Sequence, residues 1–184
     1  GHNGALIAFD TGPGNALIDD WASQSTGSRR DDGGRLAMAG AASEAGVVAL
    51  MRNPYFAAPY PKSLDRNAFA LTPVVGLSAA DGAATLVAFT AASVKAALAL
   101  LPEPPCYVVV CGGGRHNRAI MMALAELVDA AVVPIEAIGL DGDGIEAEAW
   151  AYMAVRSRRG LPISFPSTTG APEPLVGGVL ALPD

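Results

Sequence analysis

The stretch at residues 8–15, Ala-Phe-Asp-Thr-Gly-Pro-Gly-Asn, constrains the fold of this chain more than any other. A short apolar run at residues 5–9 leads into it, and a longer segment at residues 16–24 follows. Two glycines and a proline between such segments are typical of a tight turn. We therefore predict a strand at residues 5–9, then a glycine turn, then a helix at residues 16–24.

The same turn carries residue types that suit phosphoryl transfer. Asp10 ends the predicted strand, and Gly12 and Gly14 let backbone N–H groups approach a ligand without side-chain obstruction. Asn15 is a good N-cap for the next helix, whose first turn offers N–H donors and the positive end of the helix dipole. The turn would then hold an acid beside an anion cradle, which suits a reaction governed by positioning and electrostatics. An ordinary loop has the same composition, so this reading needs further support.

Asp10-Thr11-Gly12 is also the active-site triplet of aspartic proteases, which pair two such carboxylates. The triplet occurs once in this chain, so a protease of this kind would have to dimerise. Aspartic proteases are almost all strand, and the remainder of the sequence predicts many helices. The protease is therefore kept as an alternative that a helical fold would exclude.

Composition limits the remaining choices. The 184 residues are enough for a single domain, 1–184, with a substantial core. Apolar residues make up 51% and aromatic residues only 6%, so the core must consist of Ala, Val and Leu, which suits close packing of helices on a sheet. Charged residues are 16%, which is low and predicts that another domain or subunit covers part of the surface. A net charge of -6 favours neither nucleic acid nor an anionic membrane as a partner.

Neither the cysteines nor the histidines predict a metal site. Cys106 and Cys111 lie on one predicted strand with side chains on opposite faces, and we expect buried free thiols in a reducing compartment. His2 and His116 form no metal motif with them. The longest apolar run, residues 82–101, is mostly Ala and predicts a buried helix of a soluble protein instead of a membrane span.

Apolar runs alternate with helical patterns through the rest of the chain. This order predicts an α/β fold in which several helices pack on a small, mainly parallel sheet, and a chain that looks like half of a larger protein. Ser78 and Asp81 resemble a capping box at the start of the longest helix. The predicted elements are helices at 36–52 (interrupted near Gly40 and Gly46), 79–101, 117–128 and 145–158, strands at 106–111 (buried and parallel) and 131–135, and a proline-broken excursion at 53–67.

A second glycine turn, Gly112-Gly113-Gly114, directly follows the predicted strand at 106–111 and opens a helix. It is not the Rossmann fingerprint, because Asn117 stands where the third glycine belongs, and the chain has no Walker A sequence. Three glycines can form a flat backbone platform for a base, ribose or phosphate. A close strand-to-helix turn without a ligand is the alternative.

Taken together, the two turns are specific. Asp-Thr-Gly-Pro-Gly-Asn at 10–15, followed by Cys-Gly-Gly-Gly-Arg-His-Asn at 111–117, resembles the anhydro-N-acetylmuramic acid kinase family. The likeness extends, in the right order, to four more segments. These are Pro-Lys-Ser-Leu-Asp-Arg-Asn-Ala-Phe at 61–69, Asp-Gly-Ala-Ala-Thr-Leu at 81–86, the acidic segment at 141–150, and Thr-Gly-Ala at 169–171.

The resemblance implies the actin, hexokinase and heat-shock chaperone ATPase superfamily, with a ribonuclease H-like, small mixed sheet and several packed helices. Such proteins have two related α/β domains with nucleotide in the cleft. The family is a transferase that uses Mg-ATP and water to convert 1,6-anhydro-N-acetylmuramic acid to N-acetylmuramic acid 6-phosphate and ADP. This reaction belongs to amino sugar metabolism, in peptidoglycan recycling. The resemblance further implies a cytoplasmic homodimer in which the nucleotide phosphates carry most of the Mg²⁺ coordination.

The resemblance also assigns roles to single residues. Asp10 would be the general base on the attacking water. Gly12 and Gly14 would approach the phosphates. Lys62, with Arg66, and Glu146 are weaker candidates for substrate contacts. Surface pairing with Asp65 or Asp31 explains the two basic residues equally well. The helix dipole explains an acid such as Glu146 at a helix start. The adenosine side would consist of Gly112, Gly113, Gly114 and Asn117. We expect Trp21, Trp150 and Tyr152 to be packing residues.

The chain departs from the family in one respect. Chains of the family are about twice as long and begin with a glycine- and serine-rich phosphate loop that this sequence lacks. We therefore expect the C-terminal, nucleotide-binding half of a two-domain sugar kinase, inactive or nearly so without its N-terminal half. The alternative is a non-catalytic, stand-alone domain that binds ATP or a partner, or only dimerises.

Overall fold

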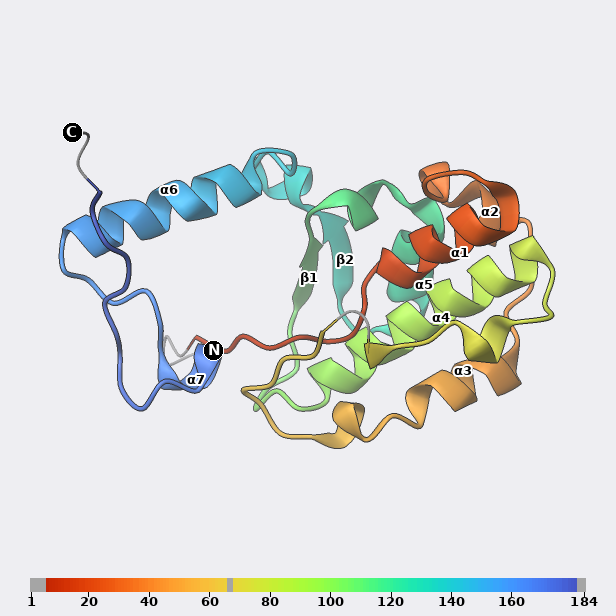
Figure 1. Ribbon diagram of the computed structural model, residues 1–184, viewed down its shortest axis with the longest axis horizontal. Coiled ribbons are helices and arrows are strands. Elements are labelled where there is room, and N and C mark those ends of the chain that lie inside the picture. Colours follow the sequence, from red (N-terminus) through yellow and green to blue (C-terminus); the bar gives the residue numbers. More distant parts are fainter. Residues whose placement is uncertain (1–5, 66–67, 182–184) are drawn as a thin grey trace.

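The helices pack around one long central helix, α4 (Ala79–Leu98), in the computed structural model, which describes residues 6–65 and 68–181. Phe89 and Leu86 of α4 are fully buried, and the rings of Phe56 and Phe69 pack on Phe89 with centroids 5.7 and 5.8 Å away. This cluster forms the centre of the core. The helices in contact with α4 are α1 (Ala16–Thr26), α2 (Arg35–Met38), α3 (Glu44–Met51) and α5 (Arg118–Leu127) (Figure 1).

Small residues allow the helices to approach α4 closely. A Cβ atom on Gly82 would lie 2.4 Å from ring atoms of Trp21, and one on Gly40 would lie 2.2 Å from the backbone of Ala80. Trp21 is buried, and its Nε1–H donates to the carbonyl of Ala79 at 2.8 Å. Trp21 is a packing residue, as predicted. The expectation that the core consists of Ala, Val and Leu is correct only in part, because these residues surround a centre of three phenylalanines.

The predicted helix at 36–52 is interrupted, as expected, but at one place instead of two. It is two helices, α2 and α3, separated by residues 39–43, and α3 begins where the Ser43 hydroxyl accepts the N–H of Gly46 at 3.2 Å. The break near Gly40 is confirmed, but Gly46 lies inside α3, close to Thr85 of α4. The Ser78 cap is confirmed, since its hydroxyl accepts the N–H of Asp81 at 3.0 Å, although α4 ends at Leu98 instead of near 101.

The sheet is smaller than the sequence predicts. β1 (Tyr107–Val110) pairs in parallel with β2 (Ala131–Pro134), with Tyr107 opposite Ala131, and α5 connects the two strands. The fold is therefore mixed α/β with a small parallel sheet, as expected. Among the described residues this sheet has two strands, and the only other strand pairing is an isolated antiparallel bridge between Ser164 and Leu175.

The predicted strand at 5–9 is wrong over residues 6–9, and residue 5 lies outside the described part of the chain. The segment is extended, but its backbone bonds go to two unrelated segments. The N–H of Ala8 donates to Ser167 at 3.3 Å, and the N–H of Asp10 donates to Lys62 at 3.1 Å. A strand needs a ladder to one partner, and an apolar pattern cannot supply the partner.

The expectation that β1 is buried is also wrong. Val108 and Val110 pack against the core. Tyr107 and Val109, on the opposite face, are 66% and 38% exposed, so one face of the strand is open. Cys106 and Cys111 are free thiols as predicted, but both are exposed. The sequence reports the apolar character of this strand but not whether both faces are covered.

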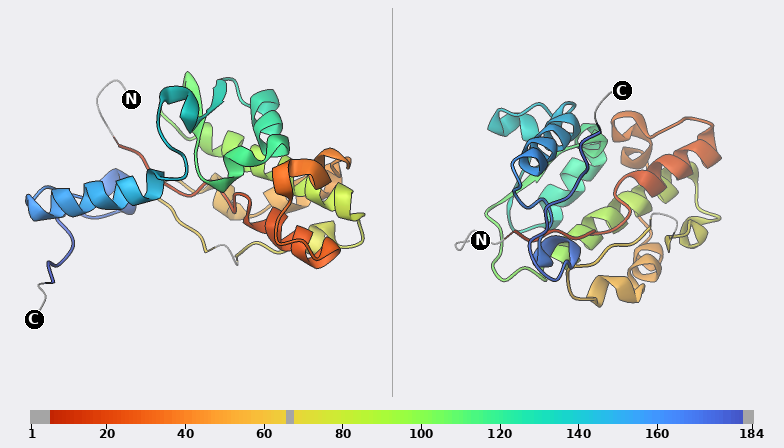
Figure 2. Two further views of the ribbon diagram at one scale, coloured as in Figure 1. Left: turned by 90° about the horizontal axis from the view of Figure 1, so that it is seen from above. Right: turned by 60° about the vertical axis from the view of Figure 1, so that its left-hand side comes forward.

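The last part of the chain forms an arm. Helix α6 (Ile145–Arg158) extends away from the helices around α4 in Figure 1 and in the left view of Figure 2, and residues 159–181 fold back from its far end. Trp150 and Tyr152 lie on α6 and are 71% and 62% exposed, so the expectation that they pack inside the fold is wrong for this chain. The remaining helical elements are α7 (Pro166–Thr169) and 3-10 turns at Asp32–Gly34, Pro54–Ala57, Thr72–Val74, Gly113–His116 and Ile135–Ile138.

This architecture excludes the aspartic protease alternative, because such proteases are almost all strand and the strands described here are two segments of four residues. Within residues 6–65 and 68–181, no helix has both the length and the apolar character that crossing a membrane requires. The same residues contain no cluster of three or more His, Cys, Asp or Glu side chains that could hold a metal ion. His2 and Arg66 lie outside the described residues.

Candidate functional site

Asp10 is exposed at the edge of a small cavity of about 190 Å³ that Gly12, Pro13, Leu64 and Phe69 also line. Its carboxylate oxygen Oδ2 accepts the N–H of Leu64 at 3.0 Å. Its backbone is fixed as well, because the Tyr55 hydroxyl donates to the Asp10 carbonyl at 2.7 Å. Asp10 is therefore a positioned carboxylate that solvent can still reach.

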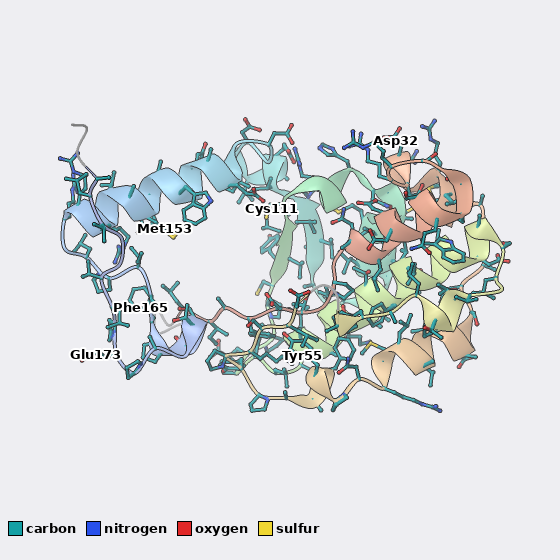
Figure 3. The ribbon with its side chains drawn as sticks, in the orientation of Figure 1. Asp32, Tyr55, Cys111, Met153, Phe165 and Glu173 are labelled. Carbon is teal, nitrogen blue, oxygen red and sulfur yellow. The ribbon has the colours of Figure 1, made fainter. Side chains whose placement is uncertain are left out.

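Tyr55 and Lys62 form the support beneath Asp10. The Lys62 ammonium donates to the carbonyls of Tyr55 and Phe56 at 2.9 and 3.3 Å and lies 4.6 Å from the centre of the Tyr55 ring. Figure 3 labels Tyr55. Burial lowers the pKa of Lys62. Burial also raises the pKa of Tyr55, and the charge of Asp10 raises it further. Asp31, which the sequence offered as a partner of Lys62, instead accepts the backbone N–H groups of Leu36 and Ala37.

Glycine is required at the two positions of the first turn, Gly12 and Gly14, for different local reasons. A Cβ atom on Gly12 would lie 2.8 Å from the Ser93 hydroxyl of α4, so packing alone requires a glycine there. Gly14 adopts a φ of 60°, and its carbonyl accepts the Thr90 hydroxyl at 3.0 Å. The prediction that Asn15 caps α1 through its side chain is wrong, because its Nδ2 donates to Asp19 at 2.8 Å. Burial raises the pKa of Asp19, and the hydrogen bond from Asn15 opposes that rise.

The second glycine turn borders a larger cavity of about 360 Å³. Gly112 has a φ of 69°, and a Cβ atom on Gly113 or Gly114 would meet no heavy atom within 4 Å. The backbone of these two glycines is therefore open toward the cavity. The residues lining it are Asn15, Asp19, Arg30, Asp31, Asp32, Gly33, Gly113, Gly114, His116 and Asn117.

Asn117 starts α5 as predicted. Its side-chain oxygen accepts the N–H of Ile120 at 3.1 Å, and the residue is buried. A Cβ atom on Gly34 would lie 2.3 Å from that oxygen, so the loop before α2 presses directly on Asn117. No role was predicted from the sequence for residues 25–35. The run Arg-Arg-Asp-Asp-Gly-Gly at 29–34 is the signal that could have identified this segment as a wall of the cavity.

Arg115 is the residue that sequence reasoning missed most clearly. Its side chain is only 4% exposed and donates to Glu136 at 2.7 Å, to Asp143 at 2.6 Å and to the carbonyl of Gly112 at 3.0 Å. The guanidinium holds the pKa values of the Glu136 and Asp143 carboxyls below their usual values. Arg115 thus ties the glycine turn to the loop that leads into α6.

The structure brings most of the predicted residues into two groups. Asp10, Gly12 and Lys62 surround the smaller cavity or its support, and Gly113, Gly114 and Asn117 line the larger one. The turn at 10–15 connects them, because Asp10, Gly12 and Pro13 border the first cavity and Asn15 the second. Glu146 is exposed in the first turn of α6 and lines neither cavity.

The chain is a mixed α/β domain in which one glycine turn lies between a positioned carboxylate and a second glycine turn, and the family that it matches is one of kinases. The family model that matches is that of anhydro-N-acetylmuramic acid kinase, and the match covers residues 2–182. The chain belongs to this family. The resemblance found from the two glycine turns is confirmed.

Relatives named anhydro-N-acetylmuramic acid kinase align over almost all of this chain. The Rhodospirillum rubrum protein is 58% identical over 172 residues, which are 94% of this chain and 46% of the relative. The Caulobacter vibrioides protein is 57% identical over 97% of this chain and 48% of its own length. The Acidiphilium cryptum protein is 53% identical over 100% of this chain and 51% of its own length. The chain thus spans about half the length of the relatives that it matches.

Proposed function

We propose that this chain is the C-terminal, nucleotide-binding half of an anhydro-N-acetylmuramic acid kinase with the actin and hexokinase type of fold. The observation that carries the proposal is the turn at 10–15, which borders both the cavity at Asp10 and the cavity at Gly113 and Gly114. An acid on this turn and a backbone platform across the second cavity suit phosphoryl transfer, because its catalysis is mostly positioning and charge stabilisation. Family membership supports the same function.

Asp10 is the general base in this proposal. Water adds to C1 of 1,6-anhydro-N-acetylmuramic acid and transfers a proton to the Asp10 carboxylate as the bond from C1 to the bridging oxygen breaks. The bridging oxygen, now on C6, forms a bond to the γ-phosphorus of ATP, and the bond to ADP breaks. The hydrogen bond from Leu64 to Oδ2 holds the carboxylate in one orientation, which favours proton transfer to a positioned base.

The two glycine turns bind the nucleotide in this proposal. Gly113 and Gly114 have no side chain between their backbone and the cavity, so a flat adenosine group can lie against them, with Gly112 and Asn117 fixing the turn. Gly12 and Gly14 stand nearer to Asp10, where the phosphates would be. Mg²⁺, when bound, neutralises phosphate charge, and it would be held mainly by the phosphates, because Mg²⁺ keeps few protein ligands in such sites.

Lys62 and Glu146 remain candidate substrate contacts of lower rank. Lys62 is close to Asp10 through the Asp10–Lys62 backbone bond, and its ammonium would have to leave two carbonyls to reach a sugar. Glu146 lines neither cavity, so it would contact only a sugar that extends from these cavities toward α6. We further propose a cytoplasmic homodimer that acts in peptidoglycan recycling.

Calorimetric titration of this chain with Mg-ATP tests the nucleotide site. We expect Gly113→Val to abolish measurable binding, because its side chain fills the cavity, whereas Asp10→Asn should retain it. Ala125→Val, on the exposed side of α5, is the matched control for added volume. Binding that survives Gly113→Val unchanged would contradict the proposed platform.

Phosphoryl transfer tests the role of Asp10. In a chain extended to the length of the relatives, Asp10→Asn should lower kcat about 1,000-fold, because the amide oxygen still accepts from Leu64 but cannot take a proton. Asp129→Asn, an exposed carboxylate between α5 and β2, is the control. Equal kcat for Asp10→Asn and the control would remove Asp10 from catalysis.

A further inference from the structure

Helix α6 of the arm is charged at both ends and exposes large apolar side chains between them. Helix α6 has 14 residues and none of them is buried. Trp150, Tyr152 and Val155 are 71%, 62% and 50% exposed, and they do not lie on one side of the helix. A helix with apolar residues around its circumference is normally surrounded by protein.

A groove runs along the arm, between α6 and the segment that folds back from it. Its volume is about 620 Å³, and apolar side chains such as Trp150, Met153 and Ile163 line it. Figure 3 labels Met153 on α6. Val179 and Leu180 close its other side while remaining 97% and 63% exposed. Exposed apolar side chains gathered along one groove are a feature of interaction sites.

The total surface of the chain leads to the same conclusion. A compact monomer of 18.6 kDa would expose about 8,200 Å², by the scaling of surface with mass. This chain exposes 11152 Å². The difference of about 3,000 Å² is comparable to the surface that a large, obligate interface covers.

We propose that the arm, α6 with residues 159–181, docks on the half of the family's chain that is not part of this sequence. This inference rests on the proposed function, in which this chain is the C-terminal half. The family match runs to residue 182, so the arm belongs to chains about twice as long. The preceding half would also lie close to the arm. Ser167 of α7 accepts a hydrogen bond from the N–H of Ala8 and donates one to the carbonyl of Leu6, near the first described residues.

A covalently joined half is favoured over a second copy of the chain as the occupant. Two segments of one chain meet at an effective concentration in the millimolar range, well above that of free subunits. The charges of the arm define the partner surface further. Glu146 and Glu148 are exposed at the start of α6, and Arg158 and Arg159 at its end. The partner surface should have an apolar centre, basic groups facing the start of α6 and acidic groups facing its end.

Hydrogen–deuterium exchange tests the proposal directly. This 184-residue chain is compared with a longer chain in which it replaces the matching 172-residue stretch of the Rhodospirillum rubrum kinase. Amides of α6 should exchange at least about tenfold more slowly in the longer chain, while those of α4 are protected equally in both. Trp150→Glu should reduce that protection, and Val75→Glu, at a side chain that is also 71% exposed, should leave it unchanged.

Equal exchange of α6 in both chains, with α4 protected, would overturn the proposal. Protection of α6 that rises with the concentration of the 184-residue chain would make a second copy the occupant and would overturn it as well. The intact Rhodospirillum rubrum kinase, measured over its segment aligned with α6, gives the same comparison without a new junction. A phosphoryl-transfer assay on the longer chain keeps the two proposals apart. Transfer with α6 unprotected rejects the docking alone, and protection without transfer rejects the kinase function alone.

Discussion

Arg115 shows how a single side chain can hold a binding turn in place. Its guanidinium joins Gly112 of the glycine turn to Glu136 and Asp143, which belong to later segments of the chain. A Cβ atom on Gly142 would lie 2.4 Å from the Arg115 Nε atom, so the acidic loop closes tightly over the guanidinium. The shape of the turn at 112–114 therefore depends on residues about 30 positions further along the chain.

We expect Arg115→Met to lower the melting temperature by about 5 °C, because it removes the shared partner of a carbonyl and two carboxylates. The fall is moderate because the side chains of Glu136 and Asp143 are 48% and 79% exposed, so water can solvate them. Thermal unfolding followed by circular dichroism measures the change. Arg118→Met, at an exposed arginine of α5, is the matched control, and equal melting temperatures for both variants would contradict this role.

The same cluster predicts a dependence on pH. Arg115 holds the pKa values of Glu136 and Asp143 below their ordinary values of 4.5 and 3.8. A lowered pKa in the folded state contributes stability that is present above the ordinary pKa and is lost as the pH falls through the folded value. The difference in melting temperature between the unmodified chain and Arg115→Met should therefore shrink below about pH 4. A difference that is constant from pH 7 to pH 3 would show that the carboxylates do not contribute.

The hydrogen bonds of a side chain could be predicted where its partner is close to it in the sequence. Ser78 caps α4 as expected, and Asn117 caps α5 in the same way, because a cap needs only a side chain and an N–H group three residues away. Asn15 satisfies the same pattern and yet binds Asp19. Arg115 was not identified, because its partners are distant in sequence. Whether Asp10 acts as a base remains a prediction for the kinetic experiment.

The elements were predicted best where they are helices. Helix α6 has the bounds expected from sequence, and α1 begins at the expected residue, because helical hydrogen bonds form within a segment. Strands need a partner from elsewhere in the chain. The segment at 6–9 is apolar enough for a strand, but it bonds to Ser167 and its continuation to Lys62, so no ladder forms.

Close packing of α1 on α4 gives a prediction for the element scale. Gly82→Ala should destabilise the fold by about 1–2 kcal/mol, because the added methyl group overlaps the buried ring of Trp21, which is held by its bond to Ala79. Helix propensity alone would stabilise the variant by about 1 kcal/mol, so the sign of the change decides between the two effects. Denaturant unfolding measures it. Gly113→Ala, where the methyl group meets no atom within 4 Å, is the control.

At the scale of the whole molecule, the arm makes the chain less compact than its length requires. A compact domain of 184 residues has a radius of gyration of about 16 Å. We expect small-angle X-ray scattering of this chain, extrapolated to zero concentration, to give a larger value, because α6 extends beyond the other helices (Figure 2). A monomer with a radius of gyration at or below 16 Å would mean that the arm folds back onto the body in solution.

The helices, the two glycine turns and the family could be predicted from the sequence by itself. The sequence is also the basis for our proposal that this chain is the C-terminal half of the family's chain. These depend on local spacing and on the order of motifs, both of which can be read along the chain. Only the tertiary structure decided that residues 6–9 form no strand and that one face of β1 and the two cysteines are exposed. It also decided that Arg115 anchors the glycine turn and that α6 has no buried residue. Each of these depends on which distant segment is available as a neighbour. Pairing, burial and exposure depend on contacts between segments that are distant in sequence. A local pattern indicates which contacts a segment could make, but not which neighbour the fold places beside it.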